Sequence, residues 1–200
     1  MNPKTYKQKL LDELYAPYQN CHMCPLGFLG RTNVVFGHGN ADARLILIGE
    51  GPGADEDAQG KPFVGRSGKL LTKLLNMMGV EREDIFITNI VKCRPPGNRK
   101  PMPIESNTCK KLLLLNQIKI IRPDIICTLG SSSLTGLLNS DDIRITQMRG
   151  KILQNVLPEP INTIPILPTY HPAYILRNPK ELQRLYDDLE QAAKFAHLIS

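Results

Sequence analysis

The sequence predicts an α/β protein: a three-layer α/β/α sandwich around a central four-stranded parallel sheet. Four short runs of β-branched and other apolar residues carry this prediction, because they are nearly continuous in hydrophobicity, like strands buried on both faces of a sheet. Segments with apolar residues at helical spacing lie between these runs. Such an alternation of strands and helices is typical of parallel sheets.

Each predicted element has its own signal in the chain. The predicted strands are RLILIG, DIFITNIV, DIICTLG and TIPILPTY, at residues 44–49, 84–91, 124–130 and 163–170. The predicted helices occupy residues 67–79, 103–121, 131–139 and 180–199. The first of these helices closes on a glycine, the second begins with a proline suited to a first turn, and the third begins on serines suited to capping.

Length and charge narrow the range of functions. The chain has 200 residues, of which 42% are hydrophobic, and this fits one domain over residues 1–200 with a full core. It carries 25 Lys and Arg against 19 Asp and Glu, a net charge of +6. This excess favours an anionic partner such as nucleic acid without identifying it.

The N-terminal segment and the cysteines indicate a compartment. Residues 1–18 lack the uninterrupted apolar stretch of a signal peptide, and no run approaches the roughly 18 apolar residues of a membrane span. We therefore expect a soluble, intracellular, cytoplasmic protein that has no membrane partner and is a monomer. In a reducing compartment the five cysteines are expected to be metal ligands, core residues or catalytic thiols.

The loops after the predicted strands should form one rim, because ligands of parallel sheets gather at the carboxyl ends of the strands. The first loop, GEGPGADED at 49–57, superficially fits a dinucleotide fingerprint, but Pro52 interrupts it and its acidic residues would repel a pyrophosphate. The segment GKP at 60–62 lacks the spacing of a P-loop. Both kinds of nucleotide site are thereby excluded.

The cysteines fall into two groups. Cys21 and Cys24 form a C-x2-C pair that can reach one metal, and Cys93 and Cys109 flank a loop rich in proline and cations. Cys127 lies within a predicted strand and is most simply a core residue. Four thiolates suffice for zinc or for an iron-sulfur cluster, and the distant second pair suits a cluster better. The alternative is that all five are unrelated buried thiols.

Six motifs in register resemble the family 4 uracil-DNA glycosylases, which carry a [4Fe-4S] cluster. These motifs are CHMCPL, GEGPGADED, GKPFVGRSGKLL, TNIVKCRPPGNR, Cys109 and HPAYILR, and the resemblance covers about residues 6–195. It implies a monofunctional enzyme that flips uracil out of DNA, hydrolyses the N-glycosidic bond and leaves an abasic site. It also implies that the cluster ligands are Cys21, Cys24, Cys93 and Cys109.

The resemblance suggests roles that can be checked against the chemistry. Phe63 offers a face on which a flipped pyrimidine stacks, and the side-chain amide of Asn89 can pair with both a donor and an acceptor on the uracil edge. His171 can donate a hydrogen bond to the uracil O2 as negative charge develops there. Without the resemblance, Phe63 reads equally well as a core residue and Asn89 as a turn cap.

The sequence does not decide which group activates the attacking water. The resemblance puts Glu50 in the uracil pocket, where it could orient water or stabilise a positive sugar, and the backbone of Gly49 and Gly51 could contact the base. We therefore expect Glu50 and His171 to be the catalytic pair. The acidic run Asp55–Asp57 is interpreted as structural, capping a turn or supporting the loop.

Cations and the segment after His171 should meet DNA. Arg94, Arg99 and Lys100 would contact phosphates from the loop that the cluster pins, and the cluster itself is assigned a structural and DNA-positioning role. Residues 174–177 are expected on a short exposed loop. There Arg177 would contact a phosphate or fill the gap in the base stack, while Leu176 would either wedge into the vacated space or pack inward.

Two other classes of function remain. A zinc-stabilised nucleic-acid-binding module without catalysis would explain the charge and the cysteines, but not Phe63, Asn89 and His171. A small-molecule α/β hydrolase would explain a polar rim, but the sequence lacks a G-x-S-x-G nucleophile elbow.

Overall fold

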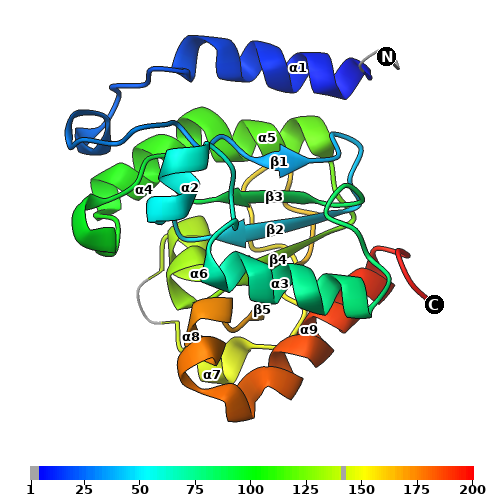
Figure 1. Ribbon diagram of the computed structural model, residues 1–200. Helices are drawn as coiled ribbons and strands as arrows, with labels where there is room; N and C mark the ends of the chain where they lie inside the picture. The colour runs from blue at the N-terminus through cyan, green and yellow to red at the C-terminus, as the bar shows by residue number, and fades with distance from the viewer. Residues whose placement is uncertain (1–4, 141–142) are drawn as a thin grey trace.

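The computed structural model describes residues 5–140 and 143–200, so the predicted domain over residues 1–200 includes positions 1–4 and 141–142 outside the described residues. Within the described part, one sheet has five strands in the order β1-β3-β2-β4-β5 (Figure 1). The strands are β1 (His38–Gly39), β2 (Leu45–Gly49), β3 (Phe86–Asn89), β4 (Ile125–Leu129) and β5 (Ile166–Thr169).

The four predicted strands are all present and pair in parallel, from β3 through β2 and β4 to β5. Each is shorter than its apolar run because the ends of the runs lie in the adjoining turns. The sheet has one strand more than the four predicted parallel strands: β1 pairs antiparallel with β3 at the edge. No apolar run marks β1, because His38 is exposed and Gly39 has no side chain.

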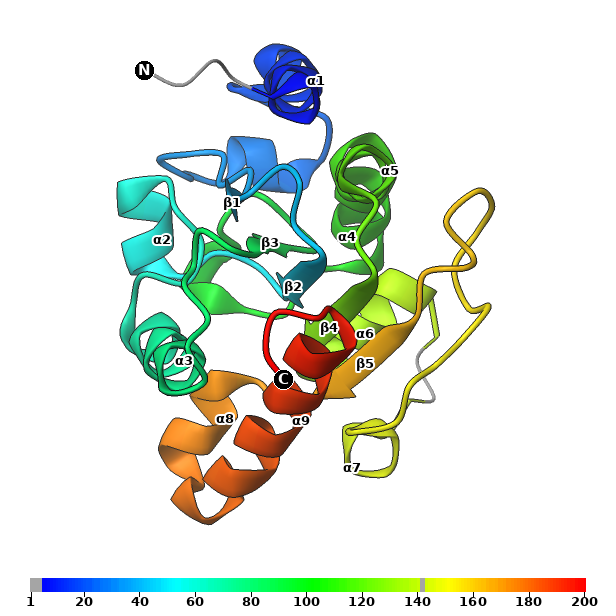
Figure 2. The ribbon, with the colours of Figure 1, turned by 90° about the vertical axis from the view of Figure 1, so that its right-hand side faces the viewer.

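Helices cover both faces of the sheet (Figure 2). The longer segments are α1 (Tyr6–Tyr15), α3 (Arg66–Met77), α4 (Pro103–Cys109), α5 (Leu115–Ile121), α6 (Ser131–Leu138) and α9 (Leu182–Phe195). Shorter helices are α2 (Ala54–Gln59), α7 (Ile145–Met148) and α8 (Pro172–Arg177). The sheet and these helices form the three-layer α/β/α sandwich that the sequence predicts.

Two apolar clusters hold the layers together. On one face, α1, α5 and α6 pack on side chains such as Ile46 and Ile126, and on the other face α3, α8 and α9 pack on Leu47 and Cys127. The alternating side chains of β2 and β4 therefore serve both clusters. This explains the continuous hydrophobicity of the strands, since neither face of the sheet meets solvent.

The helix predictions hold with two differences. The predicted helix over residues 103–121 is continuous, but it contains a π-helical turn at Lys110–Leu114 directly after Cys109. Residues 174–177, expected as an exposed loop, instead lie in α8. Pro172 stands in the first turn of α8, where its missing N–H costs nothing, and His171 precedes it as the N-cap residue. Among the described residues, no helix combines the length and the apolar character needed to cross a membrane.

A buried ion pair fastens α9 to the end of the sheet. The Asp188 carboxylate, 2% exposed, accepts hydrogen bonds from Arg149 Nε at 2.9 Å and from the Thr169 hydroxyl of β5 at 2.6 Å. Burial raises the pKa of Asp188, although both hydrogen bonds act in the opposite direction. Arg149 also lies over the Tyr170 ring, so this one guanidinium joins the segment after α7 to both β5 and α9.

Replacing Arg149 with methionine should destabilise the fold by about 3 kcal/mol, because it leaves the Asp188 carboxylate buried without its cation. Equilibrium urea unfolding followed by circular dichroism measures the change. The matched control is Arg184→Met, which removes an exposed ion pair with Glu181 and should shift the midpoint far less. Equal shifts from the two variants would contradict the importance given to the buried pair.

Candidate active site

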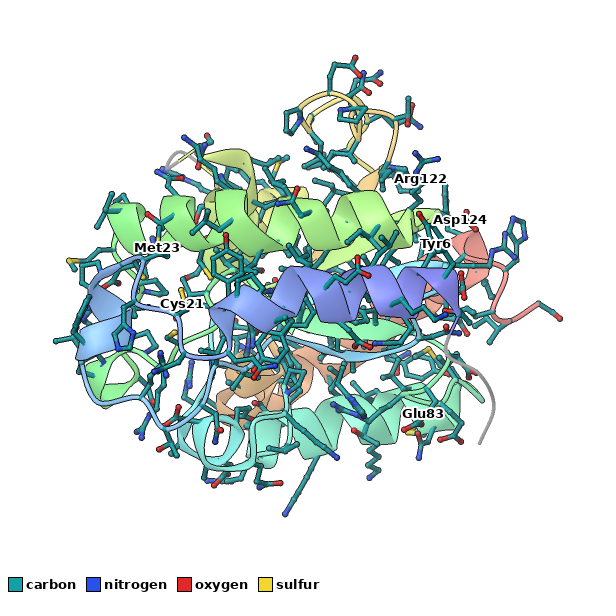
Figure 3. All side chains as sticks on the ribbon, turned by 90° about the horizontal axis from the view of Figure 1, so that it is seen from above. Tyr6, Cys21, Met23, Glu83, Arg122 and Asp124 are labelled. Carbon is teal, nitrogen blue, oxygen red and sulfur yellow. The ribbon has the colours of Figure 1, made fainter. Side chains whose placement is uncertain are left out.

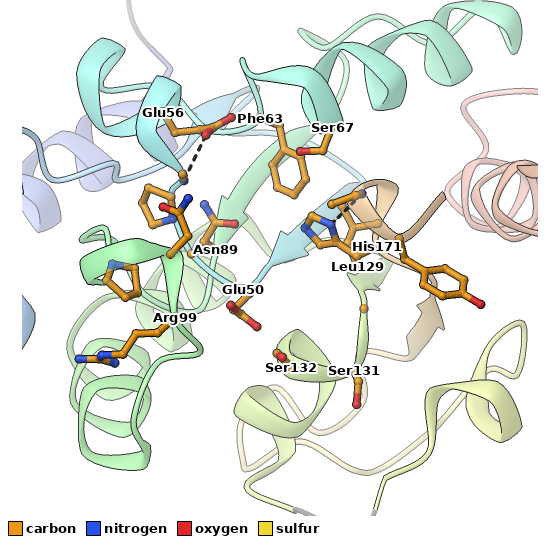
Figure 4. Close-up of a pocket in the computed structure, with 18 of the residues that line it drawn as sticks. Glu50, Glu56, Phe63, Ser67, Asn89, Arg99, Leu129, Ser131, Ser132 and His171 are labelled. Carbon is orange, nitrogen blue, oxygen red and sulfur yellow. Dashed lines mark hydrogen bonds between the residues drawn. The ribbon is translucent and has the colours of Figure 1, made fainter. Parts of the chain in front are cut away.

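A cavity of about 520 Å³ opens at the carboxyl ends of the parallel strands (Figure 4). It is lined by residues from the loops after β2, β3, β4 and β5, and by the segment that leads into α3. The chain runs from β2 to its neighbour β3 on one side. It then crosses from β3 to β4, which lies on the other side of β2, so the direction of winding reverses at β2. Ligands of open α/β sheets bind at such a point of reversal, so this cavity is the candidate active site.

Phe63 forms one wall of the cavity. Its backbone has φ of 53°, in the left-handed region, which typically costs a non-glycine residue about 1–2 kcal/mol. The ring is 95% buried, and its centroid lies 5.6 Å from that of His171 with the two planes inclined by 31°. Figure 4 shows the ring between Ser67 and His171 at the cavity.

Asn89 ends β3 with its side chain in the cavity. The residue is 1% exposed, and its Oδ1 has no hydrogen-bond partner among the described residues. Gly49 lies opposite Asn89 in the ladder, and a Cβ atom on Gly49 would stand 2.4 Å from Asn89 Oδ1 and 2.6 Å from Phe63 Cζ. A glycine is therefore needed for the amide and the ring to approach each other. An unpartnered buried acceptor is costly and indicates a ligand.

His171 has a defined tautomer. The backbone N–H of Ala173 donates to Nδ1 at 3.0 Å, so Nδ1 carries no proton and the neutral ring is protonated on Nε2. Burial and, to a lesser extent, the nearby charge of Arg177 lower the pKa of His171 to about 4, against a smaller opposite effect of Glu56. At neutral pH the ring is therefore an uncharged Nε2–H donor at the edge of the cavity.

Glu50 follows β2 directly and lines the cavity from the side opposite Phe63 (Figure 4). Its backbone carbonyl accepts a hydrogen bond from Val91, and that of Gly49 accepts one from Ile90. The β2–β3 ladder thus continues beyond the strands and holds the chain from Gly49 to Gly51 at the cavity. The predicted uracil-site residues, Gly49, Glu50, Gly51, Phe63, Asn89 and His171, are brought together.

Two residues of the acidic run after β2, Glu56 and Asp57, support the surrounding loops through their carboxylates. The Glu56 carboxylate accepts hydrogen bonds from the backbone N–H groups of Gly53, Val64 and Gly65, at 3.1, 2.9 and 2.8 Å. The buried Asp57 carboxylate accepts from the N–H groups of Thr32 and Asn33. Glu56 therefore ties the start of α2 to the loop of Phe63.

The four predicted DNA-contacting cations are placed differently from one another. Arg177 lines the cavity, is exposed, and has no hydrogen-bond partner within residues 5–140 and 143–200. Arg99 makes a two-point ion pair with the buried Glu105, at 2.7 and 2.8 Å, and Figure 4 shows its side chain directed away from the cavity centre. Arg94 donates to the Asn98 side chain, and Lys100 is exposed beside the cavity.

Four thiols, those of Cys21, Cys24, Cys93 and Cys109, line a second, narrow cavity beneath the loop of Arg94. Figure 3 shows Cys21 and Met23 on the loop beyond the carboxyl end of α1. In the described residues, however, no group of three or more metal-binding side chains already stands close enough to share an ion. Cys127 is fully buried in β4 and does not line this cavity.

The thiols behave as a mutually interacting set. Burial, and after it the neighbouring Cys109, raise the pKa of Cys93 to about 12, with smaller contributions in the same direction from Cys21 and Cys24. Burial likewise raises the pKa of Cys109 to about 11, against an opposing effect of Lys92. Arg31 donates to the Cys21 carbonyl at 2.7 Å, and its buried Nε has no partner among the described residues.

Several cavity residues were missed by the sequence reasoning. Ser131 and Ser132 begin α6 at the cavity, and Ser67 lies in the first turn of α3 beside Phe63 (Figure 4). The position of the serines at the end of a predicted strand was available as a signal for the first two. Nothing in the sequence indicates Ser67, because its place depends on how the Phe63 loop folds.

Comparison with known proteins gives a consistent result. A sequence model of the uracil DNA glycosylase superfamily matches residues 36–194. The chain is 44% identical to the type-4 uracil-DNA glycosylase of Thermotoga maritima over 194 residues, 94% of this chain and 96% of that protein. The type-4 enzyme of Saccharolobus solfataricus is 44% identical over 186 residues, 90% of this chain and 84% of that protein. That of Archaeoglobus fulgidus is 37% identical over 184 residues, 90% of each chain.

A nuclear magnetic resonance titration should give His171 a midpoint of about pH 4, with ring signals unchanged from pH 8 down to about 5.5. The folded-state pKa lies below the usual 6.5, so the unfolded chain binds more protons between these values. The stability that the neutral ring contributes is therefore present above pH 6.5 and is lost as the pH falls toward 4. A His171→Gln variant assigns the signals. A midpoint near 6.5 would refute the enclosed, neutral ring.

Proposed function

The chain belongs to the uracil-DNA glycosylase superfamily, and with its type-4 relatives as the guide we propose that it is a DNA repair glycosylase that removes uracil from DNA. The enzyme flips the uracil nucleotide out of the helix and hydrolyses its N-glycosidic bond. Free uracil leaves, and an abasic site remains in an otherwise intact strand. The base must flip out because the side chains that line the cavity cannot reach the glycosidic bond of a base that is stacked inside the duplex.

One observation carries the proposal. Phe63, Asn89 and His171 come from three separate segments of the chain, yet they line one cavity at the carboxyl ends of the strands. Together they offer the face of an aromatic ring, a side-chain amide that both accepts and donates hydrogen bonds, and a neutral N–H donor. These are the groups needed to stack on a pyrimidine, to pair with its edge and to stabilise it as it leaves as an anion.

Asn89 and Phe63 select the base. The unpartnered Asn89 Oδ1 accepts the N3–H of uracil, while Nδ2 donates to O4, so both polar atoms of the amide gain partners when the base enters. Cytosine lacks the N3–H and presents an amino donor instead of O4, which would leave Asn89 mismatched. Selection follows because a buried polar group without a partner typically costs about 1–3 kcal/mol.

His171 stabilises the leaving group. Its Nε2–H points where the developing charge on uracil O2 can accept it, and this interaction strengthens as the bond breaks. A neutral donor is sufficient, so no proton has to be transferred to the base. In the bond change, the C1′–N1 electron pair leaves with uracil and the oxygen of a water molecule forms the new bond to C1′. The proton that this water loses passes to solvent, and the released uracil anion takes up a proton from solvent.

Glu50 acts on the sugar side of the reaction. Its carboxylate lines the cavity at the carboxyl end of β2, where a negative charge stabilises the positive sugar and can hold the attacking water. No lysine lines the cavity in the described part of the chain, so an amine nucleophile that would cleave the strand is not supplied there. Hydrolysis alone is the expected chemistry.

DNA is held by the cations around the cavity. Arg177, Lys100 and Arg94 contact phosphates, whereas the main task of Arg99 is to fix the loop by its ion pair with Glu105. Leu176 is 40% exposed on α8, while the neighbouring Ile175 supplies the inward packing at 2% exposure. Leu176 is therefore free to wedge into the space that the flipped nucleotide leaves.

We further propose that the four thiols of the narrow cavity hold a [4Fe-4S] cluster. The donor set fits: four cysteines line one cavity, their thiols influence one another's ionisation, and the orphaned Arg31 Nε–H lies beside Cys21 as a donor toward an anionic group. When bound, the cluster would cross-link segments that are distant in the sequence. It would have no redox role, because hydrolysis of the glycosidic bond requires no electron transfer. The residues of α4 and of the Arg94 loop are thereby fixed beside the active site.

A zinc-stabilised binding module without catalysis is the weaker alternative. It would account for the thiols and the net charge, but it assigns nothing to the unpartnered amide of Asn89 or to the locked tautomer of His171. Membership of the superfamily also favours the glycosylase.

Incubation with a labelled oligonucleotide that carries one uracil, without added metal, tests the function. We expect free uracil and a strand that breaks only after alkali or heat, because the cavity provides a hydrolytic site without a lysine. A matched oligonucleotide with thymine should remain intact. If no uracil is released the function is wrong, and if the strand breaks without treatment the hydrolytic mechanism is wrong.

The control for the site is His171→Ala. At saturating enzyme, its single-turnover rate should fall by roughly a hundredfold or more, because a preorganised donor to the developing anion is lost. Affinity for uracil-containing DNA should change much less. Arg177→Ala should show the opposite pattern, with weaker and more salt-sensitive binding.

Iron analysis tests the thiol assignment. Protein purified without oxygen should contain about four irons and four sulfides per chain. Cys93→Ala and Cys109→Ala should lose iron, because their thiols line the narrow cavity, whereas Cys127→Ala should keep it. Equal iron loss from all three variants would show that the cysteines are sorted wrongly, and stoichiometric zinc in place of iron would reject the cluster.

A further inference from the structure

The loop that presents Phe63 is held in an unfavourable conformation. With φ of 53°, Phe63 occupies backbone space that side chains with a Cβ rarely adopt, and its carbonyl is turned inward against α3. A Cβ atom on Gly68 would lie 1.9 Å from the Phe63 carbonyl oxygen, so this arrangement requires a glycine in the first turns of α3. Something outside the loop must keep it in place, since the chain alone would not.

Arg82 supplies that hold. It lies in the turn before β3, far from the loop in sequence, and it is half-buried. Its Nη2 donates to the Pro62 carbonyl at 2.7 Å, and its Nη1 donates to the Phe63 carbonyl at 3.0 Å and to the Thr72 hydroxyl of α3 at 3.1 Å. One guanidinium thus binds two consecutive carbonyls of the loop and the helix behind them.

The opposite side of the loop is held by the opposite charge. The N–H groups of Val64 and Gly65, the next two residues, donate to the Glu56 carboxylate. Four consecutive residues, 62–65, are therefore fixed through their backbone by a cation on one side and an anion on the other. Neither set of hydrogen bonds touches the Phe63 ring, so the ring keeps its face free for a ligand.

We propose that Arg82 is a positioning residue for base recognition: by holding the carbonyls of Pro62 and Phe63, it fixes the ring of Phe63 at the place where the flipped base stacks. This inference rests on the proposed function, because it takes the ligand of the cavity to be a pyrimidine. Arg82 does not line the cavity, so its influence on the base passes through the Phe63 loop.

The planar fork of arginine is what the arrangement needs. Two carbonyls and one hydroxyl accept from two adjacent nitrogens of one rigid group, which a lysine ammonium on a flexible chain cannot reproduce with the same geometry. Lysine does keep the charge and can still reach one carbonyl. The variants Arg82→Met and Arg82→Lys therefore separate loss of the hydrogen bonds from loss of their geometry.

The experiment measures base recognition apart from chemistry. In the protein with its native metal content, Arg82→Met should raise the inhibition constant of free uracil and the half-saturating enzyme concentration in single-turnover excision, each by roughly tenfold. The maximal single-turnover rate should change by less than about threefold. Arg82→Lys should lie between the wild type and Arg82→Met. Arg44→Met, which removes an ion pair with Asp124 at the opposite end of the sheet, should leave all three quantities unchanged.

A double-mutant cycle with Phe63→Ala distinguishes positioning from general support of the fold. If Arg82 acts through the ring, Arg82→Met adds no further loss of uracil affinity once the ring has been removed. If the affinity losses of the two substitutions instead multiply, or if Arg82→Met leaves affinity unchanged, the proposal is wrong. Should Arg82→Met fail to fold, the same cycle with Arg82→Lys decides by the same criterion.

Hydrogen exchange gives a readout that needs no activity. The amides of residues 63–68 should exchange faster in Arg82→Met than in the wild type, while those of α9 should not change. Unchanged exchange in that segment would overturn the positioning role even if excision were impaired. A wild-type protein that released no uracil would refute the proposed function instead, whereas loop exchange would still report whether Arg82 holds residues 62–65.

Discussion

The ladder that pairs Gly49 with Asn89 is the contact on which the site depends. It aligns the carboxyl ends of β2 and β3, and its continuation through Ile90 and Val91 holds the chain around Glu50 at the cavity. Because Gly49 has no side chain, the Asn89 amide and the Phe63 ring can both approach it closely. A parallel sheet with both faces buried provides the rigidity to maintain such spacing, and the loops need only present side chains from its edge.

The cavity is arranged at a cost in stability that a ligand can offset. Asn89 Oδ1 is buried without a partner, Phe63 has a left-handed backbone, and His171 is enclosed where its charged form is disfavoured. The first two features oppose folding in the free protein, and all three favour a neutral, planar, hydrogen-bonding base in the complex. The buried charges around the cavity, by contrast, are paired with backbone groups and hold its walls.

The sequence predicted the parts of the fold that depend on local pattern. The four long strands are apolar because both their faces are covered, whereas β1 escaped prediction because two polar or glycine residues pair only through their backbone. The segment after His171 looked like a loop since its helix has a single turn and a half and starts at a proline. The positions of Asn89 and His171 at the ends of predicted strands likewise predicted that both would lie at the same edge of the sheet. The hydrogen bonds of Arg82 and Glu56 to the backbone of residues 62–65 could not be predicted, because they join backbone groups to side chains of other segments and no sequence pattern marks them.

His171 is at once the N-cap residue of α8 and the ring that we propose faces the base. The same short helix carries Leu176 and Arg177 within two turns of that ring. The proposed DNA contacts of Leu176 and Arg177 and the polarity of the active site therefore both depend on the position of this one helix. A change in the sequence that shifts the start of α8 alters both at once. Under the proposed function, a change in the loop that carries Arg94 and Lys100 can alter the hold on DNA without moving His171.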